Sequence, residues 1–237
     1  MTYKTILVHL NDSRRAEAML APAAQLATRF QSHLIGLHVH AAVPASPIPM
    51  ASRALGSIVG AERKNSEVIA EIFKSMTSNK PFVAEWKLQK VPHVDLASVV
   101  MEHGRAADLI VAAQTDPDWD LSPLLDFPER LALESGRPVL VIPYAGRYSN
   151  IGRRVVIAWK AGRESARATF DALPLLQGAE SVHILEVKDP ADAESTLGTD
   201  TSIAVALARH CIKPEVRTSI TSDISVGDEI LSRAADL

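Results

Sequence analysis

The chain has 237 residues, of which 47% are hydrophobic and 22% charged, and its net charge is -3. This balance fits a globular protein of one or two domains and lacks the basic excess of a nucleic-acid-binding protein. The single cysteine, Cys211, excludes a disulfide framework, and no apolar run approaches the roughly 18 residues of a membrane helix. We therefore expect a cytoplasmic protein with neither nucleic-acid nor membrane partners.

Apolar runs alternate with amphipathic stretches through the first half. Strands are predicted at residues 6–10, 34–39, 82–88, 109–113 and 138–142. Helices are predicted after residue 13 and at about 53–78, 96–104 and 127–135. Most of these strands are continuously apolar, as strands buried on both faces are, whereas 82–88 alternates and is predicted to be an edge. This order is typical of a parallel sheet with helices on both faces.

Two connections have features of their own. Asn11, Asp12 and Ser13 follow the first strand and offer side-chain oxygens that can cap the next helix. The segment from Val39 to Lys80 contains "AAVPASPIPMASRALGS", which predicts a long irregular loop, either a mobile surface loop or a lid near a cleft.

Four stretches recur in the same order in the second half. "YKTILVHLNDSRRAEAM" matches "GRRVVIAWKAGRESARA", "LIGLHVH" matches "VHILEVK", and "KPFVAEWKLQK" matches "KPEVRTSITSD". The fourth match is "RAADL", at 105–109 and again at 233–237. The chain is therefore predicted to be a tandem of two similar α/β domains joined near "YAGRYSNIG".

The opening strand, turn and helix, together with "RAADLIV" and "RPVLVIP", resemble a tandem universal stress protein. The resemblance implies flavodoxin- or Rossmann-like domains at 1–147 and 151–237, each with a parallel sheet in the order 3-2-1-4-5. It also implies ATP as a frequent ligand and pairing of fifth strands, from which we expect a homodimer. Since the second "RAADL" stands where strand four would start, the second domain is expected to lack strands four and five.

The family's ATP motif is G-x2-G-x9-G-[S/T] after strand four, a loop whose glycines let backbone N–H groups approach phosphates. This chain has Ala113, Asp116, Asp126 and Phe127 at the matching positions. A carboxylate at Asp126 would repel a phosphate 4 Å away by about 4 kcal/mol at an effective dielectric of 20. No cofactor is therefore expected in the first domain.

The remaining nucleotide-contact positions are also altered or uninformative. The family's acidic residue after strand one is Asn11 in the first half and Lys160 in the second. Val39 and Val187 occupy the end of strand two, where a backbone contact would serve with almost any side chain. ATP would then require the cleft of a complete second domain.

No catalytic or metal-binding constellation is evident. His38 and His40 share a strand face near His9, which is short of a metal site, and neither a Walker loop nor a G-x-S-x-G elbow occurs. The sequence thus favours a non-catalytic binding and regulatory protein of the universal stress type, with a protein or small-ligand partner. The alternative is an ATP-binding or ATP-hydrolysing switch that uses the second-domain cleft.

Overall fold

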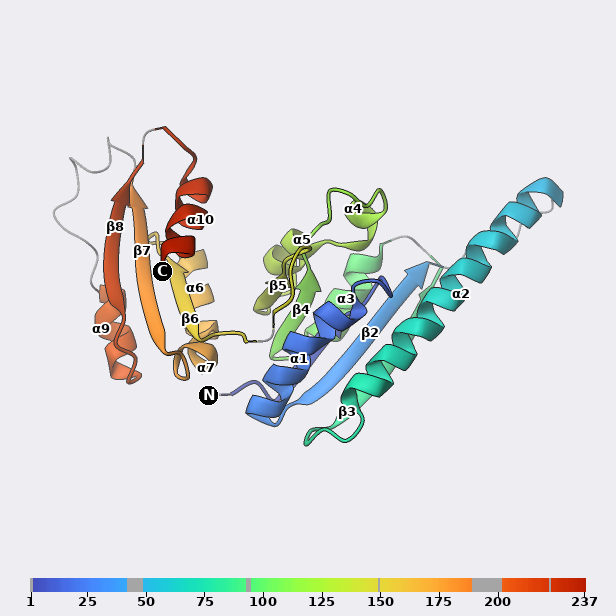
Figure 1. The fold of residues 1–237 in the computed structure, drawn as a ribbon, viewed down its shortest axis with the longest axis horizontal. Coiled ribbons are helices and arrows are strands. Elements are labelled where there is room, and N and C mark those ends of the chain that lie inside the picture. The colour runs from blue at the N-terminus through green and yellow to red at the C-terminus, as the bar shows by residue number, and fades with distance from the viewer. Residues whose placement is uncertain (1, 42–48, 93–94, 149, 189–201, 222) are drawn as a thin grey trace. The chain divides into compact units, whose positions relative to one another are not determined.

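The computed structural model describes residues 2–41, 49–92, 95–148, 150–188, 202–221 and 223–237. The chain divides into two compact units, Thr2–Ile151 and Gly152–Leu237. Each unit has a parallel sheet of its own (Figure 1). Each also has its own hydrophobic core. No helix in these described ranges is long and apolar enough to cross a bilayer.

The first unit contains a five-stranded parallel sheet in the order β3-β2-β1-β4-β5, which confirms the predicted order. Its strands are β1 (Thr5–His9), β2 (His33–Ala41), β3 (Ala84–Val91), β4 (Leu109–Ala113) and β5 (Val139–Ile142). The central strands β1 and β4 are buried almost throughout, as their apolar runs predicted. β3 lies at one edge and β5 at the other.

Helices cover both faces of this sheet. They are α1 (Ala16–Phe30), α2 (Pro49–Thr77), α3 (Leu96–Gly104), α4 (Ser122–Leu125) and α5 (Pro128–Glu134). Leu7 and Ile110 of the sheet form one core with Val100 of α3 and Leu131 of α5. The long α1 and α2 lie on the other face (Figure 1).

The predicted cap of α1 is wrong. The helix begins after Arg15, whose side chain makes no capping hydrogen bond. Asp12 instead accepts a 2.9 Å hydrogen bond from the backbone N–H of Arg14, and the backbone N–H of Ser13 donates to Asn65. A side-chain cap must directly precede the first helical turn, and here a turn over residues 13–15 intervenes. The polar side chains of this loop are therefore available for other contacts.

The segment after β2 is more regular than predicted. β2 continues past Val39 to Ala41, and α2 begins at Pro49 within the proline- and alanine-rich stretch. Proline is compatible with the first position of a helix because its missing N–H would have no helical partner there. The predicted loop or lid would fall on residues 42–48, which lie outside the described residues.

The second unit has a three-stranded parallel sheet in the order β6-β7-β8. Its strands are β6 (Arg154–Ala158), β7 (Ser181–Lys188) and β8 (Glu215–Ile220). Its described helices are α6 (Arg163–Asp171), α7 (Leu173–Leu176), α9 (Ser202–Arg209) and α10 (Val226–Asp236). Trp159, Leu176, Ile184 and Leu207 belong to its core.

Candidate functional site

The carboxyl ends of β1 and β4 lie side by side in the first unit. The two strands pair in parallel, with Val8 opposite Val111. The loop after β1 therefore meets the loop after β4 at one edge of the sheet. In open α/β sheets, ligands bind at the carboxyl ends of strands, where neighbouring connections diverge.

A buried carboxylate lies between these two loops. Asp126 is 4% exposed and follows α4 directly. Its Oδ1 accepts a 2.7 Å hydrogen bond from the amide Nδ2 of Asn11, and its Oδ2 accepts one of 2.5 Å from the hydroxyl of Ser122. The carboxylate thus accepts hydrogen bonds from both loops.

Arg15 supplies the positive charge. Its Nη1 lies 3.2 Å from Oδ2 of Asp126, and the two side chains are 12% and 0% exposed. Burial raises the pKa of Asp126, while the hydrogen bonds from Ser122 and Asn11 and the charge of Arg15 act in the opposite direction. A buried carboxylate is retained when a counter-ion and hydrogen-bond donors replace its lost water, and all of these are present.

The loop after β4 is organised around the same serine. The Ser122 hydroxyl accepts a 2.7 Å hydrogen bond from the backbone N–H of Asp116, and the Asp116 carboxylate accepts one of 3.0 Å from the backbone N–H of Asp118. Two of the positions where the family motif has glycine, Asp116 and Asp126, are therefore linked through one hydroxyl. This arrangement folds the loop back on itself.

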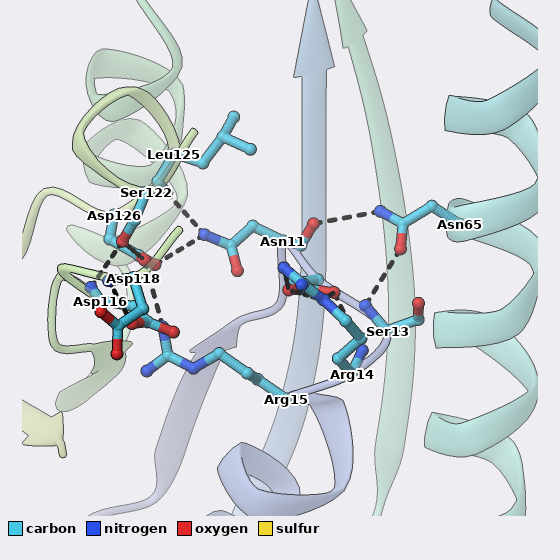
Figure 2. Close-up of polar contacts among 11 residues, drawn as sticks. Asn11, Ser13, Arg14, Arg15, Asn65, Asp116, Asp118, Ser122, Leu125 and Asp126 are labelled. Carbon is cyan, nitrogen blue, oxygen red and sulfur yellow. Dashed lines mark hydrogen bonds and ion pairs between the residues drawn. The ribbon is translucent and has the colours of Figure 1, made fainter. Parts of the chain in front are cut away.

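Asn11 extends the cluster to α2, as Figure 2 shows. Its Nδ2 also donates to the backbone oxygen of Leu125 at 2.7 Å, while its own backbone oxygen accepts from Asn65 Nδ2 at 3.1 Å. Asn65 Oδ1 in turn accepts from the backbone N–H of Ser13 at 3.0 Å. The loop after β1 is therefore held between the loop after β4 and α2.

Phe127 fills the position of the family's hydroxyl with an aromatic ring. It stacks on the imidazole of His9, with ring centroids 5.2 Å apart and an interplanar angle of 30°. Burial, followed by the nearby charge of His38, lowers the pKa of His9 to about 3. The end of β1 therefore carries a neutral, packed imidazole next to the cluster.

The other predicted site residues lie apart from these polar contacts. Ala113 is the buried last residue of β4, and Val39 is a buried core residue within β2. Lys160 and Val187 belong to the second unit, where Lys160 is exposed just after β6 and Val187 is half-buried in β7. The structure brings together Asn11, Asp116, Asp126 and Phe127 of the predicted set.

Three members of the cluster were not predicted: Arg15, Ser122 and Asn65. Ser122 could have been found, because residues four apart in a helical turn share a face and Ser122 stands four before Asp126. No sequence pattern distinguishes Arg15 from its neighbour Arg14, since both residues are equally basic. Asn65 belongs to α2, and this helix begins well after the loop in the chain.

Most donors of this site are already engaged, although the buried Arg15 Nη2 has no hydrogen-bond partner among the described residues. The Asn11 amide, the Ser122 hydroxyl and the Arg15 guanidinium would suit a ligand phosphate, yet all three are directed at Asp126 (Figure 2). Within the described ranges, no group of three or more His, Cys, Asp or Glu side chains is placed to hold a metal ion. The arrangement is a polar cluster centred on the Asp126 carboxylate.

Comparison with known proteins supplies the family. The model of the universal stress protein family matches residues 2–143, while no curated protein matches the chain. Among solved structures, a universal stress protein from Archaeoglobus fulgidus DSM 4304 is 12% identical with a TM-score of 0.62, covering 98% of this chain and 81% of that one. A putative universal stress protein from Pseudomonas aeruginosa UCBPP-PA14 is 13% identical with a TM-score of 0.48, covering 99% and 78%. At 12% identity the Archaeoglobus fulgidus structure speaks for the fold alone. The family model covers more than half of the chain, which therefore belongs to the universal stress protein family.

Proposed function

We propose that this chain is a non-catalytic binding and regulatory protein of the stress response, in which the nucleotide site of the first domain, residues 1–147, is degenerate. The observation that carries the proposal is the buried Asp126 carboxylate, bonded to Asn11, Ser122 and Arg15. Three donor side chains that a nucleotide phosphate would need are thus bonded to this internal anion, and of their nitrogens Arg15 Nη2 is buried without a partner among the described residues. The protein then acts by association rather than by turnover.

The energetic argument rests on competition between two anions. A phosphate that replaced Asp126 would have to take over three donors while the carboxylate lost its buried partners. If Asp126 remained in place, the two charges at 4 Å would repel by about 4 kcal/mol at an effective dielectric of 20, about a thousandfold in affinity. Either route disfavours binding of ATP at the carboxyl ends of β1 and β4.

Titration of the whole chain with Mg-ATP tests the proposal. Hydrogen exchange followed by mass spectrometry locates any binding, because peptides covering residues 9–15 and 113–127 report on the Asp126 cluster. We expect no protection of these peptides and no first-unit affinity tighter than about 1 mM. A micromolar dissociation constant with protection of both peptides would show a working nucleotide site.

The associating surface in this proposal is β5, through which two chains form a homodimer. β5 pairs only with β4 in the described part of the sheet, so its other side offers free backbone groups. Val141 on this strand is 39% exposed, and Leu133 on the adjoining α5 is 81% exposed. A two-fold axis would let this edge pair with its own copy.

A second candidate function is an ATP-binding or ATP-hydrolysing switch in the second unit, taken as a universal-stress-like domain of residues 151–237. The favouring observation is Trp159, whose indole Nε1 is buried without a hydrogen-bond partner among the described residues. It follows β6 next to Lys160, whose backbone N–H lies 3.4 Å from the Ser165 hydroxyl. Protection of peptides covering 158–165 by Mg-ATP, or release of phosphate, would support this function instead.

A further inference from the structure

A pocket of about 370 Å³ opens in the first unit between α2 and the sheet edge formed by β2 and β3. Ser66 and Ala70 of α2 line one side, and Trp86, Leu88 and Lys90 of β3 line the other. None of these residues belongs to the Asp126 cluster. The volume falls within the range of small-molecule sites, about 300–1,000 Å³.

Beside the pocket, α2 lies close to the sheet. At Gly36 on β2, a Cβ atom would come within 2.5 Å of the Phe73 ring, so glycine lets the helix lie close there. Phe73 also packs against Trp86, with ring centroids 5.4 Å apart. One to two turns earlier in α2, Ser66 and Ala70 are too short to fill the space over β3. The short side chains of Ser66 and Ala70 therefore leave room for the pocket next to the Phe73–Trp86 contact.

The β3 side of the pocket changes from apolar to charged along the strand. Trp86, Leu88 and Lys90 are alternate residues and so lie on one face of β3. They stand opposite Gly36, His38 and His40 of β2 in turn. From Trp86 to Lys90 the strand rises about 13 Å. The aromatic ring is thus at one end of this face and the ammonium group is at the other.

The two carboxylates of the pocket already have side-chain partners. Glu62 Oε1 lies 3.0 Å from Nε2 of His38, and this hydrogen bond lowers the pKa of Glu62. Glu67 pairs with Arg63 at 3.6 Å on the exposed rim. Among the described residues, no carboxylate pairs with Lys90. Lys90 is therefore the lining charge that can serve a ligand.

We propose that this pocket binds a small amphipathic organic anion, with its carboxylate beside Lys90 and its apolar body over Leu88 and Trp86. The half-buried His40 stands next to Lys90 in register and can offer a hydrogen bond to the same head group. Burial lowers the pKa of His40, so the ring is neutral near pH 7 and leaves Lys90 as the selective charge. This site is independent of the proposed function, since it uses other residues and another ligand class.

Three probes with one body and different head groups test the proposal: 4-phenylbutyrate, 4-phenylbutanol and 4-phenylbutylamine. Titration of the ¹⁵N-labelled full chain should shift the Trp86 indole resonance and the amides of β3 and α2. We expect 4-phenylbutyrate to bind at least about tenfold more tightly than the alcohol and the amine, as one charge-assisted contact implies. Equal or tighter binding of the amine, or no binding of any probe at millimolar concentration, would overturn the proposal.

Matched variants assign the roles. Lys90→Gln should weaken 4-phenylbutyrate about tenfold and abolish its advantage over the alcohol. Lys87→Gln is the control, because Lys87 lies on the opposite face of β3 and pairs with Glu85 at 3.3 Å. Ala70→Leu should block all three probes while preserving the dispersed spectrum of the folded chain. Unchanged 4-phenylbutyrate binding in Lys90→Gln, or shifts confined to residues away from β3 and α2, would contradict the assignment.

Discussion

The guanidinium of Arg15 and the carboxylate of Asp126 pair at 3.2 Å although 111 residues separate them in the chain. The pair joins the start of α1 to the end of α4, at the carboxyl ends of β1 and β4. It also uses the position where the family motif has its third glycine. Asp126 thus occupies a position where the family resemblance implies a glycine, and it supplies an internal anion for the donors around it.

Asp126→Ala should destabilise the first unit by about 3–5 kcal/mol. It leaves the Arg15 charge, the Asn11 amide and the Ser122 hydroxyl buried without their acceptor. Hydrogen exchange in increasing urea, read on peptides from β1 and β4, measures the change in this unit. Asp118→Ala is the control, because its carboxylate is on an exposed part of the same loop and should change stability by less than about 0.5 kcal/mol. Equal effects of the two substitutions would mean that the cluster contributes little.

The β-sheet could be predicted because its signals are local. The runs at β1 and β4 are continuously apolar, as strands covered on both faces must be, whereas Trp86 and Leu88 alternate with polar residues on the half-covered edge β3. The boundaries of the helices were harder to predict from the sequence. The start of α1 depends on a turn that places three residues between Asp12 and the helix, and composition does not specify that turn.

Only some residues of the candidate site could be predicted from the sequence. The family resemblance, with spacing counted from β4, led us to expect Asp126 and Phe127 as departures from a glycine loop, and it predicted a carboxylate facing a phosphate. The partner that neutralises Asp126 depends on long-range packing. Arg14 and Arg15 are adjacent and chemically alike, yet Arg14 lies over the ring of Trp119 at 5.1 Å while Arg15 turns inward.

The stability of the first unit should fall as the pH drops from about 7 to about 5, in part because of His9. The folded unit keeps His9 neutral down to a pKa of about 3, whereas the unfolded chain takes up a proton near its ordinary value of 6.5. The unfolded state therefore binds more protons in this window, which favours unfolding by up to about 1.4 kcal/mol per pH unit below 6.5. His9→Leu should lose less stability over the same interval in urea unfolding. Parallel losses in both proteins would rule out His9 as a source of the pH dependence.

Gly36→Ala should destabilise the first unit by about 1–3 kcal/mol, since the new methyl group would overlap the buried Phe73 ring. Adding Phe73→Leu should recover part of this loss by making room. Gly60→Ala is the matched control, because Gly60 is an exposed residue of α2 with nothing within 4 Å of its would-be Cβ. That change should stabilise the helix by about 0.5–1 kcal/mol. Thermal unfolding should order the variants accordingly, and a Gly36→Ala protein as stable as the original would show that the helix can shift freely.

Val141→Lys should convert the proposed β5 homodimer into a monomer. Val141 is the most exposed residue of the strand at 39%, whereas Ile142 is buried at 3% and would disturb the core if it were charged. A lysine at position 141 adds a charge to an apolar edge that would face its own copy across a two-fold axis, and like charges there oppose pairing.

The competing arrangement is an edge covered by the chain's own linker. In the structure, the backbone N–H of Ile151 donates to Gln25 on α1 and that of Tyr144 donates to Gln114, yet Val141 keeps its exposure. Light scattering of the full chain distinguishes the two. Leu121→Lys is the control, since Leu121 is 52% exposed on the β4–α4 loop and not on β5. Loss of the dimer in Val141→Lys but not in Leu121→Lys supports pairing through β5. A dimer that survives Val141→Lys unchanged places the contact on another surface, and a chain that is monomeric before any substitution removes the proposed assembly altogether.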